Sequence, residues 1–178
     1  MTGRRLLRWF ERALACGGVL FLVYHLGFEV LVITSDSMAP TLKGNSFRTG
    51  DRVLAEKITR RLRSPRRWEV YAYYNEDSIL IAKRVVGLPG ERVAIRGHSV
   101  LIDGVELLRP PDMAPVRYYP YGNLSKGVEV RCEGGYFMLG DDSIDSLDSR
   151  YSGCVTKDRF LGRAWRILEP SERRGWVK

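Results

Sequence analysis

Two serines and one lysine have the residue types and surroundings that could support catalysis. Ser35 and Ser37 lie in the stretch "ITSDSMAPTL", directly after a long apolar run. Lys83 lies in "SILIAKRVVGLPGE", among apolar residues that favour β-strands. Burial opposes the charged form of a lysine, which lowers its pKa and leaves a neutral amine able to accept a proton. If the lysine and a serine meet, they predict Ser-Lys nucleophilic catalysis.

Other catalytic and metal-binding chemistries find little support. The two histidines are His25, within the apolar run, and His98, in the predicted turn "RGHS". The sequence holds no G-x-S-x-G, H-E-x-x-H or P-loop motif, so we expect no metal or cofactor. Three cysteines are too few for a disulfide framework. Cys132 and Cys154 flank a polar loop, and they either pair in an oxidising compartment or remain free thiols.

The charge of the chain is strongly positive. The formal net charge of +8 comes largely from arginine. Such a surface suits anionic lipid headgroups as well as nucleic acid. The sequence has no zinc-finger spacing, aromatic RNA-binding signature or uninterrupted basic helix, so we do not expect a nucleic-acid partner.

The N-terminal region has the pattern of a membrane anchor. Residues 1–12 contain four arginines and one glutamate, and residues 13–34 are mostly apolar. About 20 apolar residues in a helix are enough to cross a bilayer. The arginines place residues 1–12 in the cytoplasm and residues 35–178 outside, in a single-pass protein of the cell (inner or plasma) membrane. The alternative is a buried helix of a soluble fold.

The rest of the chain predicts a mainly β domain over residues 35–178. Short β-rich runs are separated by Gly, Pro, Asn and Asp, and they cover 51–58, 68–74, 78–88, 91–97, 99–107, 135–142 and 162–168. Asp103-Gly104 predicts a hairpin turn. Residues 109–127, rich in Pro and Tyr, predict a loop or flap, and a short helix is expected around 171–176.

Several motifs in one order carry a family resemblance. "SDSMAPTL" followed by "KRVVGLPGE", after one N-terminal apolar run, resembles the type I signal peptidases. "GDDSIDSLDSR" is similar to the closing motif of that family, "GDRVL" to its intervening strand and "GCVTKDRFLGRAWRIL" to its last strand pair. A lone lysine in a strand is usually an edge residue, but the pairing of these motifs outweighs that interpretation. The resemblance covers residues 13–168 and implies a compact signal-peptidase-type β fold preceded by one transmembrane helix.

The resemblance also implies the catalytic roles. Ser37 corresponds to the nucleophile and Lys83 to the general base. Ser35 corresponds to the hydroxyl that forms an oxyanion hole with the backbone N–H of Ser37, where it stabilises the charge that develops on the scissile carbonyl. Ser146 corresponds to the serine that orients the lysine amine.

The loop at 140–150 combines matches and departures. Asp148 and Arg150 correspond to a structural ion pair, and Gly140 and Asp141 open the motif. The family loop commonly reads Gly-Asp-Asn-Arg-Asp-Asn-Ser, whereas residues 142–145 here read "DSID". The polar contacts normally made by the middle of the loop are therefore not assured by the sequence.

The resemblance implies how a substrate binds. An extended peptide would lie beside the strand that ends at Lys83, by β-augmentation. Small side chains at positions −1 and −3 would enter shallow apolar pockets lined by Ile33, Met38, Leu42 and Ala82. Ala82 is smaller than the residue usual at this position, which would widen a pocket.

The implied function is a membrane-anchored serine endopeptidase that cleaves N-terminal signal peptides from secreted preproteins. Its partners would be signal peptides, membrane lipid and a nearby secretion translocase. One alternative is a dedicated maturation peptidase of a conjugation or pilus system. Another is a catalytically inactive membrane scaffold of the same fold, which the presence of Ser37, Lys83 and Ser146 disfavours. A self-cleaving repressor would need a DNA-binding domain, and no helix-turn-helix pattern precedes residue 34.

Overall fold

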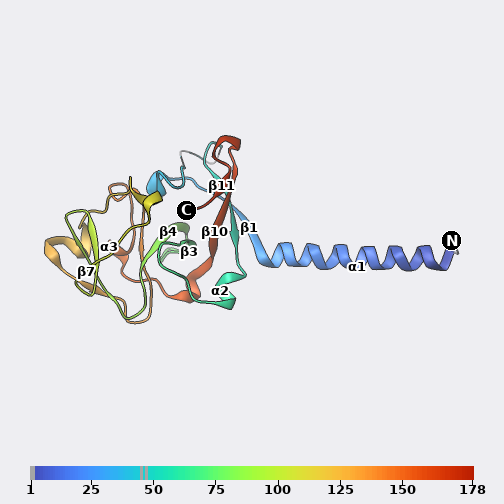
Figure 1. Cartoon of the computed structure of the whole chain (residues 1–178), viewed down its shortest axis with the longest axis horizontal. Coiled ribbons are helices and arrows are strands. Elements are labelled where there is room, and N and C mark those ends of the chain that lie inside the picture. Colours follow the sequence, from blue (N-terminus) through green and yellow to red (C-terminus); the bar gives the residue numbers. More distant parts are fainter. Residues whose placement is uncertain (1–2, 45, 47) are drawn as a thin grey trace.

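The computed structural model describes residues 3–44, 46 and 48–178, in which one long helix projects from a β domain (Figure 1). Met1 and Thr2 of the predicted basic segment lie outside the described residues. Helix α1 spans Gly3–Gly27, and strand β1 follows at once over Phe28–Val32. The predicted helix boundary at residue 34 is therefore wrong. Backbone pairing explains the correction, because β1 runs antiparallel to β2 (Arg52–Glu56) along its whole length.

The surface of α1 is unusually apolar. Large apolar side chains that are at least half exposed are Leu6, Leu7, Trp9, Phe10, Leu14, Val19, Leu20, Phe21, Leu22, Val23, Tyr24 and Leu26. Within the described chain, no helix combines the length and the apolar character needed to cross a membrane. The predicted transmembrane helix over 13–34 is not confirmed.

Two antiparallel sheets make up the domain, which confirms the mainly β class. The seven-stranded sheet has the order β1-β2-β10-β3-β4-β9, and β11 pairs with β10. Its further strands are β3 (Val70–Tyr74), β4 (Leu80–Gly87), β9 (Phe137–Leu139), β10 (Phe160–Glu169) and β11 (Gly175–Trp176). The four-stranded sheet has the order β7-β6-β5-β8, with β5 (Arg92–Arg96), β6 (Ser99–Ile102), β7 (Val105–Glu106) and β8 (Val130–Arg131).

Short helices fill the connections. Two are α-helical, α2 (Thr59–Leu62) and α3 (Ser149–Ser152). Five are 3₁₀ turns: η1 (Asp36–Met38), η2 (Pro111–Met113), η3 (Gly122–Gly127), η4 (Lys157–Arg159) and η5 (Ser171–Arg173). Residues 109–127 hold η2 and η3, in agreement with the predicted loop. The helix expected around 171–176 is instead η5 followed by β11.

The predicted hairpin turn is present between β6 and β7. Asp103 and Gly104 both have left-handed backbone conformations, with φ of 51° and 82°. Two successive residues with positive φ match the twist of the flanking strands. Each predicted β-rich run contains a strand, whereas β1, β8 and β11 were not expected.

A disulfide joins the end of β8 to the segment after α3. Cys132, just after β8, is bonded to Cys154, just after α3, with their Cα atoms 5.6 Å apart. This settles the alternative left open by the sequence. The bond fixes the far end of the 140–150 loop to the four-stranded sheet.

Candidate active site

Burial of its apolar neighbours fixes the turn that carries Ser37. Ser37 lies in η1, which follows β1 after a connection of residues 33–35. The next residue, Met38, and Leu42 are fully buried in a cluster with side chains of β2, β3 and β10. The backbone N–H of Leu42 donates to the carbonyl of Met38 (2.9 Å), which closes the turn. The apolar residues of "SDSMAPTL" therefore anchor the serine to the core.

Lys83, on strand β4, contacts Ser37 directly. Lys83 Nζ donates to Ser37 Oγ at 2.6 Å, and Ser35 Oγ lies 3.2 Å from the same oxygen. Ser37 is 8% exposed and Lys83 is 3% exposed. The structure thus brings together the three residues that the sequence singled out first.

The environment shifts Lys83 toward its neutral form. Burial lowers the pKa of the amine from 10.5 to about 8, because the ammonium loses hydration. The charges of Asp148 and Asp141 oppose this shift and raise the pKa, whereas Arg150 lowers it. Near pH 8 about half of the molecules carry a neutral amine, which can accept the proton of Ser37.

Asp148 is the hub of the 140–150 loop. Its carboxylate accepts two hydrogen bonds from the Arg150 guanidinium at 2.8 Å, and both side chains are completely buried. The same carboxylate accepts the backbone N–H of Gly140 at 2.9 Å and the hydroxyl of Ser146 at 2.8 Å. The predicted ion pair is confirmed. It holds the two ends of the loop together.

Ser146 occupies its expected place with a different partner. The residue is buried, and its hydroxyl donates to Asp148. Among the hydrogen bonds of the described residues, none joins Ser146 to the Lys83 amine, whose bond goes to Ser37. Gly140 explains why Ser146 is nevertheless close to the serine turn. A Cβ at Gly140 would collide with both Ser146 Oγ and the carbonyl oxygen of Ser37.

The middle of the loop keeps its polar contacts despite its unusual sequence. The backbone N–H of Asp142 donates to the carbonyl of Ser37 (3.1 Å), and its carboxylate accepts the N–H of Ile144 (3.1 Å). Ser143 is buried, and its hydroxyl accepts from Arg150 Nη1 at 2.6 Å. The departures from the family motif therefore leave the loop attached to the nucleophile.

Arg84 is a buried functional-site residue that the sequence reasoning missed. Its guanidinium donates to both carboxylate oxygens of Asp141, at 2.8 and 2.5 Å, and to the hydroxyl of Thr41 at 3.0 Å. It also donates to the backbone carbonyls of Trp68 and Lys178. Arg84 therefore joins the strand of Lys83 to the loop and the serine turn. A second cation directly after Lys83 in an apolar run was the available signal.

Two of the four expected substrate-binding residues are partly exposed, and the other two are buried beneath them. Ile33 and Ala82 are half-buried and pack against the cluster that contains Met38 and Leu42. Because Met38 and Leu42 are fully buried, they form the floor of any shallow pocket rather than its wall.

The edge of β4 beside the dyad is open. Strand β3 pairs with β4 from Leu80 to Arg84, on one edge. On the other edge β9 pairs only with Arg84, Val85 and Gly87. In the described chain no strand covers that second edge over residues 80–83, where the backbone can pair with an extended peptide.

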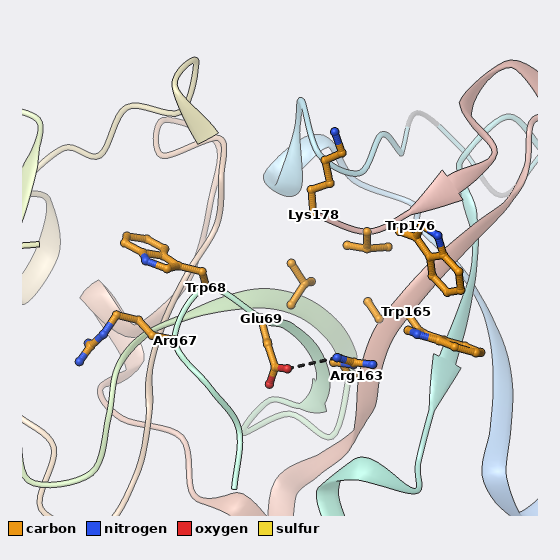
Figure 2. Close-up of a pocket in the computed structure, with 10 residues that line it drawn as sticks. Arg67, Trp68, Glu69, Arg163, Trp165, Trp176 and Lys178 are labelled. Atoms are coloured by element: carbon orange, nitrogen blue, oxygen red, sulfur yellow. Dashed lines mark hydrogen bonds and ion pairs between the residues drawn. The ribbon is translucent and has the colours of Figure 1, made fainter. Parts of the chain in front are cut away.

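A cavity of about 360 Å³ lies elsewhere in the domain (Figure 2). Figure 2 shows Trp68 on one side and Trp165 and Trp176 on the other, with Glu69 paired to Arg163 between them at 3.2 Å. The residues that line this cavity include neither Ser37 nor Lys83. It is separate from the candidate active site.

His98 lies at the exposed turn between β5 and β6, as its sequence context indicated. Its ring nitrogen is 3.3 Å from the carbonyl oxygen of Tyr118, and the ring packs edge-on against Tyr119. It is not among the contacts of Ser37 or Lys83 that the described residues make.

Comparisons with known proteins identify the family of this chain. The model of the family described as "Signal peptidase, peptidase S26" matches residues 6–168. A probable signal peptidase I-2 from Synechocystis sp. is 35% identical over 154 residues, which cover 83% of this chain and 66% of the relative. Signal peptidase I from Leptolyngbya laminosa is 32% identical over 170 residues, which cover 88% of this chain and 78% of the relative.

Among solved structures, a crystal structure of a signal peptidase I from Enterococcus faecalis V583 is 30% identical, with a TM-score of 0.46, and the match covers 60% of this chain and 98% of that chain. The extent of the family match and the sequence identity to the relatives decide the assignment. The chain belongs to the signal peptidase family, peptidase S26, whose members are serine endopeptidases.

Proposed function

We propose that this chain is a membrane-anchored endopeptidase that removes N-terminal signal peptides from secreted preproteins with a Ser37–Lys83 dyad. The 2.6 Å hydrogen bond between the buried lysine amine and the serine hydroxyl carries the proposal, in a chain of the signal peptidase family. A lysine of lowered pKa beside a serine is a base in contact with its nucleophile.

In the acylation step, the neutral Lys83 amine accepts the hydroxyl proton while Ser37 Oγ attacks the scissile carbonyl carbon. The resulting oxyanion accepts hydrogen bonds from the Ser35 hydroxyl and the backbone N–H of Ser37. Ser35 Oγ is close enough for this role, at 3.2 Å from the attacking oxygen. The Lys83 ammonium then protonates the leaving nitrogen as the C–N bond breaks. The mature protein leaves, and the signal peptide remains esterified to Ser37.

In the deacylation step, Lys83 accepts a proton from a water molecule that attacks the ester carbon. The C–O bond to Ser37 breaks, and the lysine returns its proton to the serine oxygen. The products are a signal peptide with a free carboxylate and the regenerated dyad. One base thus serves both halves of the reaction.

The substrate binds as an added strand at the open edge of Leu80–Lys83. Its main chain pairs with β4, and the residues at −1 and −3 rest on the apolar surface of Ile33 and Ala82. Small side chains fit there because Met38 and Leu42 leave no deep cavity beneath.

Cleavage of a model preprotein by the purified full chain in detergent tests this proposal. We expect one cut, located by sequencing the new N-terminus of the product, and no cut with Ser37→Ala. A panel of unrelated preproteins separates a broad signal peptidase from a dedicated maturation enzyme. An intact wild-type protein that cleaves none of them is an inactive scaffold, and the proposal fails.

We further propose that α1 anchors the enzyme in the cell membrane, with its N-terminus in the cytoplasm and the β domain outside. Two features support this placement: the exposed apolar side chains around the helix, and Arg5, Arg8 and Arg12 near its start. The helix end and β1 are continuous, so the anchor would hold Ser37 near the membrane surface. We expect the chain to resist carbonate extraction. Protease added outside spheroplasts should cut the β domain, and extraction or full protection would reject this placement.

A further inference from the structure

The two faces of β4 lead to different surroundings. Successive side chains of a strand point to opposite faces of its sheet. Leu80 and Ala82 pack against the clusters that include Leu31 and Met38. Ile81 lies on the opposite face, the face of Lys83, where it packs against the cluster of aromatic residues that includes Tyr73.

A substrate strand paired with β4 must follow the same alternation, because residues directly opposite each other share a face. The residues at −1 and −3 point to the face of Ala82 and Leu80, where only shallow surface is present. The residue at −2 then lies opposite Ile81 and points to the other face. What that face offers determines whether the −2 side chain is bound or left in solvent.

A cavity of about 290 Å³ lies on the Ile81 face. Its apolar lining comes from Tyr73, Ile81, Leu147, Tyr151 and Val155. Polar and charged residues, among them Glu76, Asp77 and Arg159, line the rest of the cavity. Neither Ser37 nor Lys83 lines the cavity, but Asp148, the hydrogen-bond partner of Ser146, does, so the cavity borders the loop that packs against the candidate active site.

Leu147 leaves exposed apolar surface at the edge of the cavity. Its side chain is 80% exposed although it follows Ser146 directly, and Tyr151 is about half exposed beside it. Covering exposed apolar area removes it from water and so favours binding of an apolar group. A bound side chain would cover both residues at once.

We infer that this cavity is a subsite for the residue at position −2 of the substrate and that it selects a large apolar side chain, such as leucine or phenylalanine. The inference rests on the proposed function and deepens it. The shallow surface at positions −1 and −3 then accepts only small side chains. The side chain at position −2 instead fills the cavity and strengthens binding of the substrate. Ile81 and Leu147 are the specificity-determining residues of this subsite.

Peptides that differ only at −2 test the inference. Each carries alanine at −1 and −3 and alanine, leucine or phenylalanine at −2, and the full-length enzyme is assayed in detergent. We expect kcat/KM for the leucine and phenylalanine peptides to exceed that for the alanine peptide by about tenfold or more. The gain should be seen mainly in KM, because the contact is made in the bound substrate as well as in the transition state.

Two variants locate the preference. Ile81→Phe fills the cavity and should lower the phenylalanine-to-alanine ratio to about 1. Leu147→Ser removes the exposed apolar rim and should lower the ratio roughly threefold. The matched control is Leu108→Ser, because Leu108 is 86% exposed and follows β7 of the other sheet. This control should keep the wild-type ratio.

Every outcome is informative. A wild-type ratio near 1, or a ratio that neither variant changes, overturns the subsite while leaving peptide cleavage intact. If the enzyme cleaves none of the peptides and no preprotein, the proposed function fails and the subsite fails with it.

Discussion

The two sheets of the domain are built on opposite principles. The four-stranded sheet covers an apolar cluster that includes Val93, Ile95 and Val100, and none of the buried polar residues found in the described chain comes from β5–β8. The seven-stranded sheet buries Lys83 and Arg84 side by side, opposite a loop that supplies buried Asp141, Asp148 and Arg150.

This difference separates stability from chemistry. Removing charges from water costs several kcal/mol per ion, and a buried ion pair is seldom more stable than an apolar replacement. Arg84 and Arg150 each donate two hydrogen bonds to a carboxylate, whereas the Lys83 amine donates to the neutral hydroxyl of Ser37. The seven-stranded sheet therefore loses folding stability by burying an amine whose pKa is lowered toward neutral pH. The four-stranded sheet has no such cost.

The largest expected effect contrasts one residue from each sheet. Lys83→Ala removes the proposed base and should lower kcat/KM by at least ~10³-fold, since dyad members act as a unit. His98→Ala, at the turn of the four-stranded sheet, should stay within about twofold of wild type. Peptide cleavage measures both. If His98→Ala were inactive and Lys83→Ala active, the catalytic base would belong to the four-stranded sheet and the proposed mechanism would be wrong.

A contrast between two glycines tests how closely the loop must approach the nucleophile. Gly140→Ala places a methyl group against Ser146 Oγ and the carbonyl of Ser37, so the loop must shift and activity should fall about 100-fold. Gly134→Ala is the matched control, because its Cβ would meet nothing within 4 Å. We expect near-normal kcat/KM for the control. Equal activity of the two variants would show that the approach is not critical.

The pH dependence should report the buried amine. Catalysis needs the neutral form of Lys83, whose pKa is lowered to about 8 by burial, so kcat/KM should rise with pH and level off above about 8. Below that value it should fall about tenfold per pH unit. His98→Ala should leave the curve unchanged. A pH dependence that disappears in His98→Ala would assign the titrating group to the four-stranded sheet and contradict the mechanism.

Stability should respond in opposite directions in the two sheets. Ile95→Ala opens a cavity in the apolar cluster and should reduce the free energy of unfolding by about 2–5 kcal/mol. Lys83→Met should instead raise it by about 1–3 kcal/mol at pH 7. Between pH 8 and 10.5 the unfolded chain retains the Lys83 proton that the folded domain has lost.

The free energy of unfolding of the wild type should therefore rise relative to that of Lys83→Met as the pH increases from 8 to 10.5. Urea unfolding at several pH values measures the difference. A Lys83→Met protein that is less stable than wild type at pH 7 would mean that the amine stabilises the fold, contrary to the comparison drawn here.

The sequence was sufficient for most of the strands and for the two residues of the dyad. Alternating or continuous apolar runs between turn residues identified β2–β6, and the short motifs around Ser37 and Lys83 predicted their meeting. It failed at β1, because "FEVLV" continues an apolar run and has no period that separates helix from strand. The pairing of β1 with β2 decides its structure, and that pairing is not local.

Polar partners were the other part that the sequence could not supply. Ser146 was expected to bind the lysine amine, but its hydroxyl donates to Asp148, a choice that depends on the folded loop. Arg84 acquires its role only when Asp141 folds back against it. Leu147 carries no signal at all in the sequence, because an exposed leucine becomes meaningful only beside a cavity.

The position of β10 has a consequence for biosynthesis. In the seven-stranded sheet, β1 precedes Ser37 and β2 follows it, β4 carries Lys83 and pairs with β3, and β10 lies between the β1–β2 pair and the β3–β4 pair. Residues 160–169 are made after Ser37, Lys83 and the 140–150 loop. A chain still on the ribosome thus already contains the serine, the lysine and the loop, yet lacks the strand that joins their halves of the sheet. Proteolytic activity should therefore appear only after residues 160–169 have left the ribosome and joined the sheet, and the nascent chain should be inactive until then.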